Sequence, residues 1–194
     1  LPSITLYSQQ ASEYKAFLRT VPAGGVATYN WVPRPTLPQT FSYSIEQGRT
    51  TAAPAVFCAA FNACQDADRE QLQRLQRAAT LGWSVTRNRA NDPVDPNAGS
   101  VARLDVRHAS TLIGSSQTGQ FNKAVGDVSR DFPVAGNVLA LRLRAGGVFG
   151  GRLNFSNGEI PNYIPQQERL FAGGAQTVRG FRQNELGPQV YVLG

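Results

Sequence analysis

The sequence predicts an all-β fold, an antiparallel transmembrane β-barrel of which about eight strands are present. Three observations predict it. Apolar residues occupy every second position in segments of strand length, and the connections between segments alternate between long and short. No stretch approaches the roughly 18 consecutive apolar residues of a membrane-spanning helix, so a helical membrane protein is excluded.

The alternation is the pattern of strands with one apolar and one polar face. Leu139, Leu141 and Leu143, for example, alternate with Arg142 and Arg144. Several segments reach the roughly 9–11 residues with which a tilted strand crosses a bilayer. In chain order the predicted strands are 3–19, 24–32, 39–47, 78–88, 99–109, 119–131, 137–149 and 187–194.

The connections support the barrel independently, because outer-membrane barrels have long extracellular loops and short periplasmic turns. The connections on one side of the predicted sheet are 48–77, 110–118 and 150–186, and the first and last of them are very long. Those on the other side are shorter turns: 33–38, 89–98 and 132–136.

The bulk composition fits this class and argues against nucleic-acid binding. The net charge is +6 and the isoelectric point about 9.8, but the positive residues are nearly all arginines spread along the chain. Several of them lie on the polar side of alternating segments, as in a solvated lumen. The mean hydropathy of −0.28 suits a barrel as well as a soluble protein, because lipid-facing and lumen-facing residues average out.

One helix is predicted inside the first long connection, in the segment QDADREQLQRLQRA. Asp66 or Asp68 is the expected N-cap, and Gln71 follows Asp68 at capping-box spacing. Leu72 and Leu75 form a narrow apolar stripe, which indicates a surface helix covering the loop.

Cys58 and Cys64, the only cysteines, lie close together with no histidine nearby. This spacing favours a disulfide over a metal site, which would need four ligands, and the alternative is a pair of free, small apolar side chains. A bridge would add about 2 kcal/mol of stability through loop closure. It would also place the segment in an oxidising compartment.

The sequence gives no indication of an enzyme, a metal site or a cofactor. The single histidine, His108, has no local signature joining it to a nucleophile, and we expect its side chain at the membrane interface or the barrel rim. The carboxylates are scattered, and the Gly173–Gly174 pair lacks the GK[ST] sequence of a phosphate-binding loop.

The connection 150–186 is long enough to be functional rather than a mere link. It holds three glycines and three apolar residues that could anchor it, namely Gly173, Gly174, Gly180, Phe171, Val178 and Phe181. Arg179 lies between two of these anchors. This suggests a loop tip inserted into a confined polar space, where the arginine needs a carboxylate partner. On the residues alone, a solvated arginine on an exposed loop is the alternative.

The segment ERLFAGGAQTVRGFRQNELGP resembles the signature of the BamA/TamA-like family of outer-membrane protein insertases, also called bacterial surface antigens, over about twenty consecutive residues. Weaker resemblances are the strand–turn–strand 80–109 and the run Asp131-Phe132-Pro133-Val134. Together they cover most of residues 78–194.

The resemblance implies a barrel of sixteen strands whose motif loop lies between the eleventh and twelfth. By that count, residues 1–194 are strands five to twelve of a single barrel domain, with the loop 150–186 folding into the lumen and no POTRA module in the chain. Half a barrel leaves two unpaired edges, so we expect a longer native polypeptide or an associated partner. Val178, Arg179, Gly180 and Phe181 would form the loop tip, supported by Phe171, Gly173 and Gly174, and the acidic partner of Arg179 would lie beyond Gly194.

The function implied by the resemblance is non-enzymatic assembly of proteins in the bacterial outer membrane. The expected partners are unfolded outer-membrane protein clients, the lipid bilayer and accessory periplasmic or outer-membrane subunits, with no cofactor and no nucleic acid. Three alternatives are a two-partner secretion translocator, which shares the loop motif, a passive outer-membrane pore, and a soluble β-rich binding module.

Overall fold

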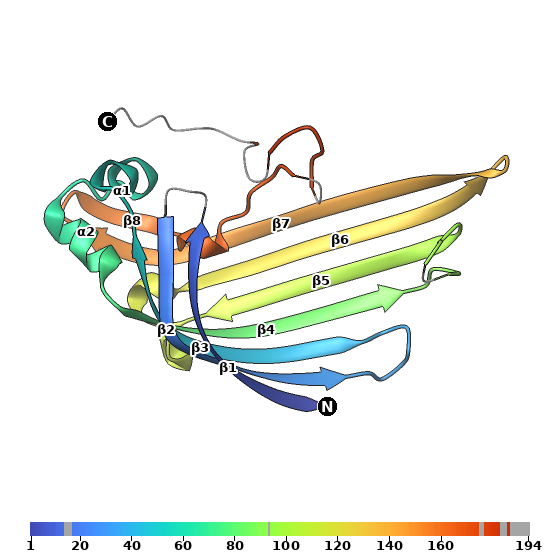
Figure 1. Ribbon diagram of the computed structural model, residues 1–194, viewed down its shortest axis with the longest axis horizontal. Helices are drawn as coiled ribbons and strands as arrows, with labels where there is room; N and C mark the ends of the chain where they lie inside the picture. Colours follow the sequence, from blue (N-terminus) through green and yellow to red (C-terminus); the bar gives the residue numbers. More distant parts are fainter. Residues whose placement is uncertain (14–16, 93, 175–176, 183–185, 187–194) are drawn as a thin grey trace.

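The computed structural model describes residues 1–13, 17–92, 94–174, 177–182 and 186. It contains one open antiparallel sheet in which every strand pairs with its neighbours in the sequence (Figure 1). The predicted all-β antiparallel fold is confirmed. The strands are β1 Pro2–Glu13, β2 Phe17–Trp31, β3 Gln39–Thr51, β4 Gln76–Asn88, β5 Gly99–Ala109, β6 Phe121–Val134, β7 Asn137–Phe155 and β8 Gly158–Tyr163.

Seven of the predicted strands correspond to β1–β7, but the eighth strand of the sheet is a different one. The predicted strand 187–194 lies outside the described residues. Strand β8 instead comes from the predicted loop 150–186, because β7 continues to Phe155 and returns through a two-residue turn. Asn157-Gly158, with Gly158 at a φ of 119°, was the sequence signal for this hairpin.

The prediction that the first two strands are 3–19 and 24–32, with a break at 20–23, is wrong. Strand β1 ends at Glu13, and β2 begins at Phe17 and runs through the predicted turn with a bulge between Thr20 and Ala23. Pro22 lies at this bulge, where a strand tolerates a proline. Gly24 is needed for packing and not for a turn, because a Cβ there would lie 2.7 Å from the Tyr7 ring on the neighbouring strand.

The predicted turn 132–136 is shorter than expected. Strand β6 extends to Val134, which pairs with Asn137, so only Ala135 and Gly136 make the turn. Both have positive φ, 46° and 79°, as a two-residue type I′ hairpin requires.

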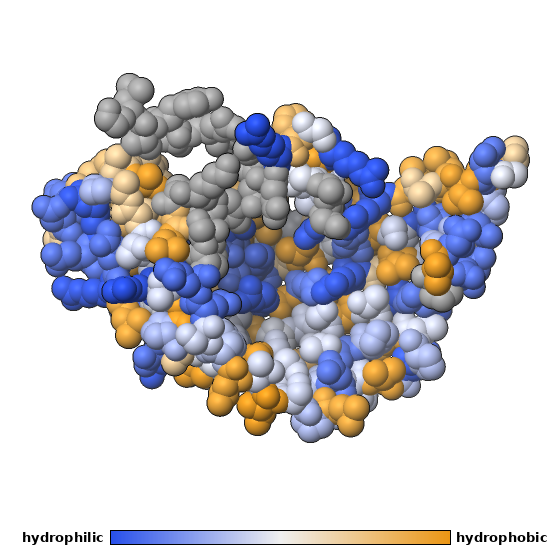
Figure 2. Space-filling view, viewed as in Figure 1, coloured by the Kyte–Doolittle hydropathy of each residue, from blue (hydrophilic) through white to orange (hydrophobic). Residues whose placement is uncertain are grey.

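The strand pairing sorts the side chains onto two faces of the sheet. The polar face carries Thr28, Ser42, Ser44, Thr80, Ser84, Arg103, Asp105, Asp127, Ser129, Arg142 and Arg144. The apolar face carries Ile4, Leu6, Tyr29, Phe41, Tyr43, Leu81, Trp83, Leu104, Val128, Leu141 and Leu143. In Figure 2 hydrophilic residues are visible in the hollow of the sheet, and hydrophobic residues gather along its lower margin.

Most of the large side chains of the apolar face are exposed and not packed into a core. Leu143 is 71% exposed and Ile4 80%. An apolar face of this extent, left uncovered by the described chain, is typical of contact with lipid.

The connection between β3 and β4 contains two helices, α1 Pro54–Phe61 and α2 Asp66–Gln73. The predicted helix is therefore found in α2 but is shorter, and α1 was not predicted. The predicted N-cap is wrong: Gln65 occupies the N-cap position, and no side chain caps α2. None of the described helices is long and apolar enough to span a membrane.

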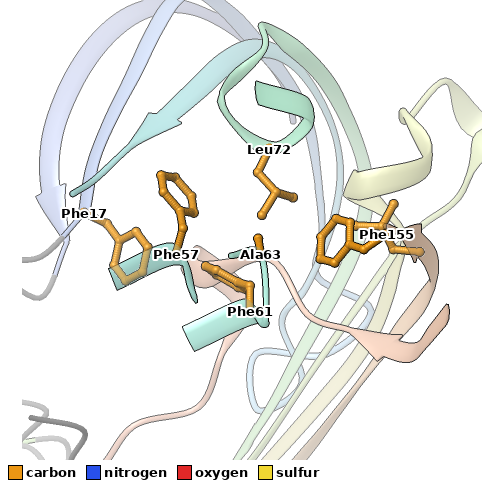
Figure 3. Close-up of a cluster of buried hydrophobic side chains, with 7 residues drawn as sticks. Phe17, Phe57, Phe61, Ala63, Leu72 and Phe155 are labelled. Atoms are coloured by element: carbon orange, nitrogen blue, oxygen red, sulfur yellow. The ribbon is translucent and has the colours of Figure 1, made fainter. Parts of the chain in front are cut away.

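These helices and the disulfide between Cys58 and Cys64 form a compact unit, residues 52–75, which we call the cap. The cap packs against the far ends of the strands through a cluster of buried hydrophobic residues (Figure 3): Phe17, Phe57, Phe61, Ala63, Leu72, Leu153 and Phe155. Phe17 comes from β2 and Phe155 from β7, so the cluster joins the cap to two strands that are not neighbours in the sheet. Among the described residues, this is the main hydrophobic core.

Candidate functional site

The polar face carries ion pairs in place of an apolar core. Arg142 donates to Asp127 with its Nε 2.8 Å from the carboxylate, and Arg103 pairs with Asp105 at 2.9 Å. Both arginine side chains are more than half exposed, so these pairs belong to a hydrated, charged surface.

A further ion pair on this face is almost enclosed. Arg19 pairs with Glu46, and both side chains are largely buried. The hydroxyl of Tyr7 donates to the same carboxylate at 2.8 Å. Glu46 therefore joins three adjacent strands, β1, β2 and β3.

After β8 the chain turns onto the polar face through a short 3-10 helix, Gln166–Glu168. The carboxylate of Glu168 lies between two cations of the sheet, 2.8 Å from Nη1 of Arg107 on β5 and 3.4 Å from Nζ of Lys123 on β6. The Glu168 side chain is only 5% exposed, so the charge is paired in a buried setting. A buried carboxylate without such partners would be strongly destabilising.

The next residue, Arg169, is anchored to the cap. Its guanidinium lies 4.4 Å from the centre of the Phe61 ring and donates from Nη2 to the carbonyl of Ala60 at 3.1 Å, both at the end of α1. Its Nε donates to the carbonyl of Ile164 at 3.4 Å. Burial lowers the pKa of Arg169, although an arginine side chain remains protonated in proteins.

Leu170 then packs directly over β7. A Cβ at Gly146 would lie 3.3 Å from Leu170 Cδ1 and 3.0 Å from both the Ala124 carbonyl and Val125 Cγ2. Gly146 shares the polar face with Arg142 and Arg144, so its missing side chain makes room for the connection on that face. We call residues 166–170 the loop base.

Beyond the loop base the chain forms a tight loop. Gly173 and Gly174 have φ of 113° and 92°, which only glycine adopts readily. The Thr177 hydroxyl accepts a hydrogen bond from the Gly173 amide at 2.8 Å, and the Gly174 amide donates to the Phe181 carbonyl at 2.9 Å. These bonds tie the two glycines to Thr177 and Phe181, and we call the described residues 173–174 and 177–181 the tip loop.

The structure thus brings the predicted tip residues together at the end of this turn. Val178, Arg179, Gly180 and Phe181 are all exposed, and Val178 borders a groove whose opposite wall includes Arg142 and Arg144. Within the described part of the chain, no acidic side chain pairs with Arg179. Its predicted partner lies beyond Gly194, so this role stays a prediction.

Two residues of the site were missed from the sequence, Glu168 and Arg169. They begin the ERLF segment. The sequence shows that they have opposite charges, but it does not show that Glu168 binds the sheet and Arg169 binds the cap. His108 takes no part: it lies on the apolar side and contacts the side chains of Asn122 and Ser110 at 2.7 and 3.1 Å. Among the described residues, no group of three His, Cys, Asp or Glu side chains is placed to hold a metal ion.

An open sheet with a lipid-compatible outer face, a charged inner face and a loop docked on the inner face defines an outer-membrane barrel protein. The family comparison identifies which kind. Residues 19–194 match the Omp85 superfamily domain, and the chain belongs to this superfamily. It is a bacterial outer-membrane protein. At the level of the family, the associated activity is insertion or translocation of proteins at the outer membrane.

A solved structure similar to this chain is that of BamA from Haemophilus ducreyi lacking POTRA domains 1–3. The TM-score is 0.65 at 17% sequence identity, and the match covers 95% of this chain and 36% of that one. At this identity the match concerns the fold alone. The chain spans little more than a third of the length of that protein.

Proposed function

We propose that this chain is the central part of a BamA/TamA-like insertase, which assembles unfolded outer-membrane proteins into the bilayer. The proposed activity breaks no covalent bond and requires no cofactor, since the folding of the client in lipid provides the driving force. Accessory subunits are expected to act with the complete protein.

The observation that carries the proposal is the course of the connection after β8. Residues 166–170 lie on the polar face, held by Glu168 and Leu170, and the loop that follows carries the Val178–Phe181 motif. This course supports a motif loop that lies inside the barrel wall and not on the outer surface. A loop in this position can stabilise the wall while clients enter at a seam between strands.

The test is client insertion by the full-length protein, purified and reconstituted in liposomes. We expect Arg179→Ala to lower the yield of folded, protease-resistant client several-fold, because the tip loses the charge that its predicted acidic partner would bind. Arg152→Ala is the matched control, since Arg152 is an exposed arginine of β7 outside the site. We expect it to leave insertion unchanged.

Three results would contradict the proposal. Insertion by Arg179→Ala at the wild-type rate would remove the role of the tip. Export of a soluble client without insertion would indicate a secretion translocator. Ion conductance with no effect on any client would indicate a passive pore.

A further inference from the structure

We infer that Glu168 and Arg169 are positioning residues for the tip loop, and that the disulfide-closed cap sets the position of this loop through Arg169. The inference concerns the regulation of the proposed site, and only its consequence for insertion rests on the proposed function.

Two adjacent residues of opposite charge anchor the loop base to two different parts of the molecule. Glu168 binds the sheet through Arg107 and Lys123. Arg169 binds the cap through the Phe61 ring and the Ala60 carbonyl. Because neighbouring residues cannot move independently, the sheet and the cap together fix the direction in which the chain leaves Arg169.

The cap holds its side of this anchor rigidly. Phe61 is 6% exposed and packs in the hydrophobic cluster against Phe17 and Tyr163, with ring centres 5.7 and 5.4 Å apart. The disulfide joins Cys58, one turn earlier in α1, to Cys64 just beyond the helix. It therefore restricts the helix end that presents both contacts of Arg169.

The tip loop starts only four residues after Arg169 and is closed by hydrogen bonds of its own. We therefore expect the tip loop to follow any movement of its base. Loss of the contacts between the cap and Arg169 should therefore loosen the tip loop, although the two segments lie far apart in the sequence.

The test is hydrogen–deuterium exchange of the full-length protein in detergent, followed by mass spectrometry of peptides covering the tip loop. The Gly174, Thr177 and Leu186 amides are hydrogen-bonded, which makes them direct reporters of loop opening. We expect Arg169→Ala to speed exchange in residues 171–182 by roughly tenfold, the effect of losing about 1.4 kcal/mol of local stability. Exchange in β3–β6 should stay unchanged.

The coupling to the cap is tested with Cys58→Ala/Cys64→Ala. We expect this double variant to speed exchange in the tip loop as well as in α1, and to add little more in the Arg169→Ala background, because both changes release the same anchor. Arg152→Ala is the control for loss of an arginine. Arg169→Lys, which keeps the charge but not the planar stacking group, provides a milder variant if Arg169→Ala does not fold.

Tip-loop exchange that stays at the wild-type rate in folded Arg169→Ala or Arg169→Lys would overturn the inference. Additive effects of the cysteine and arginine changes would also overturn it, since they would show two independent anchors. Neither readout involves a client. Failure of insertion with the predicted exchange pattern would therefore count against the proposed function alone.

Discussion

At the scale of single residues, stability on the polar face depends on charges that are paired and largely enclosed. Glu46 satisfies Arg19 and Tyr7 together, so its removal leaves a guanidinium with no carboxylate in a position shielded from solvent. We expect Glu46→Ala to lower the free energy of unfolding by about 3 kcal/mol. The measurement is the denaturant midpoint of the full-length protein in lipid vesicles, followed by the loss of heat-modifiable mobility on gels.

The matched control is Glu159→Ala, because Glu159 forms an exposed pair with Arg152 at 3.5 Å. An exposed pair contributes at most about 1 kcal/mol. Equal midpoints for the two variants would contradict the importance of enclosure. The sequence could place Glu46 on the polar side of its strand, but it could not identify Arg19 as the partner. Arg19 was assigned to the first predicted strand, whereas it belongs to β2, the strand next to β3.

At the scale of elements, the cap is tied to the β7–β8 hairpin by one buried carboxylate. Asp68 is 3% exposed, and its Oδ1 accepts hydrogen bonds from both the amide and the hydroxyl of Ser156, each 2.8 Å away. We expect Asp68→Ala to destabilise the cap by about 1–3 kcal/mol, because the amide and the hydroxyl of Ser156 lose their charged acceptor. Limited proteolysis at Arg69 and Arg74 should become faster while the strands remain protected. If Asp66→Ala, on the exposed side of α2, speeds the cleavage equally, the contact with Ser156 is not the cause.

The elements also indicate what sequence patterns can and cannot predict. Strands β3 to β7 were predictable because their two faces meet different surroundings, which imposes a two-residue period. The bulge in β2 was not, because Pro22 and Gly24 serve a local irregularity and the Tyr7 ring yet have the composition of a turn. Asp68 and its partner Ser156 are 88 positions apart in the sequence, and Arg169 and Ala60 are 109 apart. No local sequence pattern encodes contacts over such separations.

At the scale of the whole molecule, the two faces of the sheet are the basis of the assignment to the outer membrane. The apolar face exposes leucines and aromatic rings, and the polar face carries ion pairs and the docked loop base. The sequence predicted both faces and the tip motif. It did not predict that the connection after β8 is held at two points, because that depends on contacts between the sheet, the cap and residues 166–170.

The most direct test of this account is the accessibility of spin labels placed one at a time along β7 in the full-length protein in bilayers. Labels at Leu141 and Leu143 should be accessible to oxygen, which concentrates in lipid, and labels at Arg142 and Arg144 should be shielded from it. A strand with one face toward lipid and one toward the lumen gives this two-residue alternation. Uniform accessibility, or high oxygen accessibility at the arginine positions, would contradict the assignment of this sheet to a barrel wall, on which the other conclusions depend.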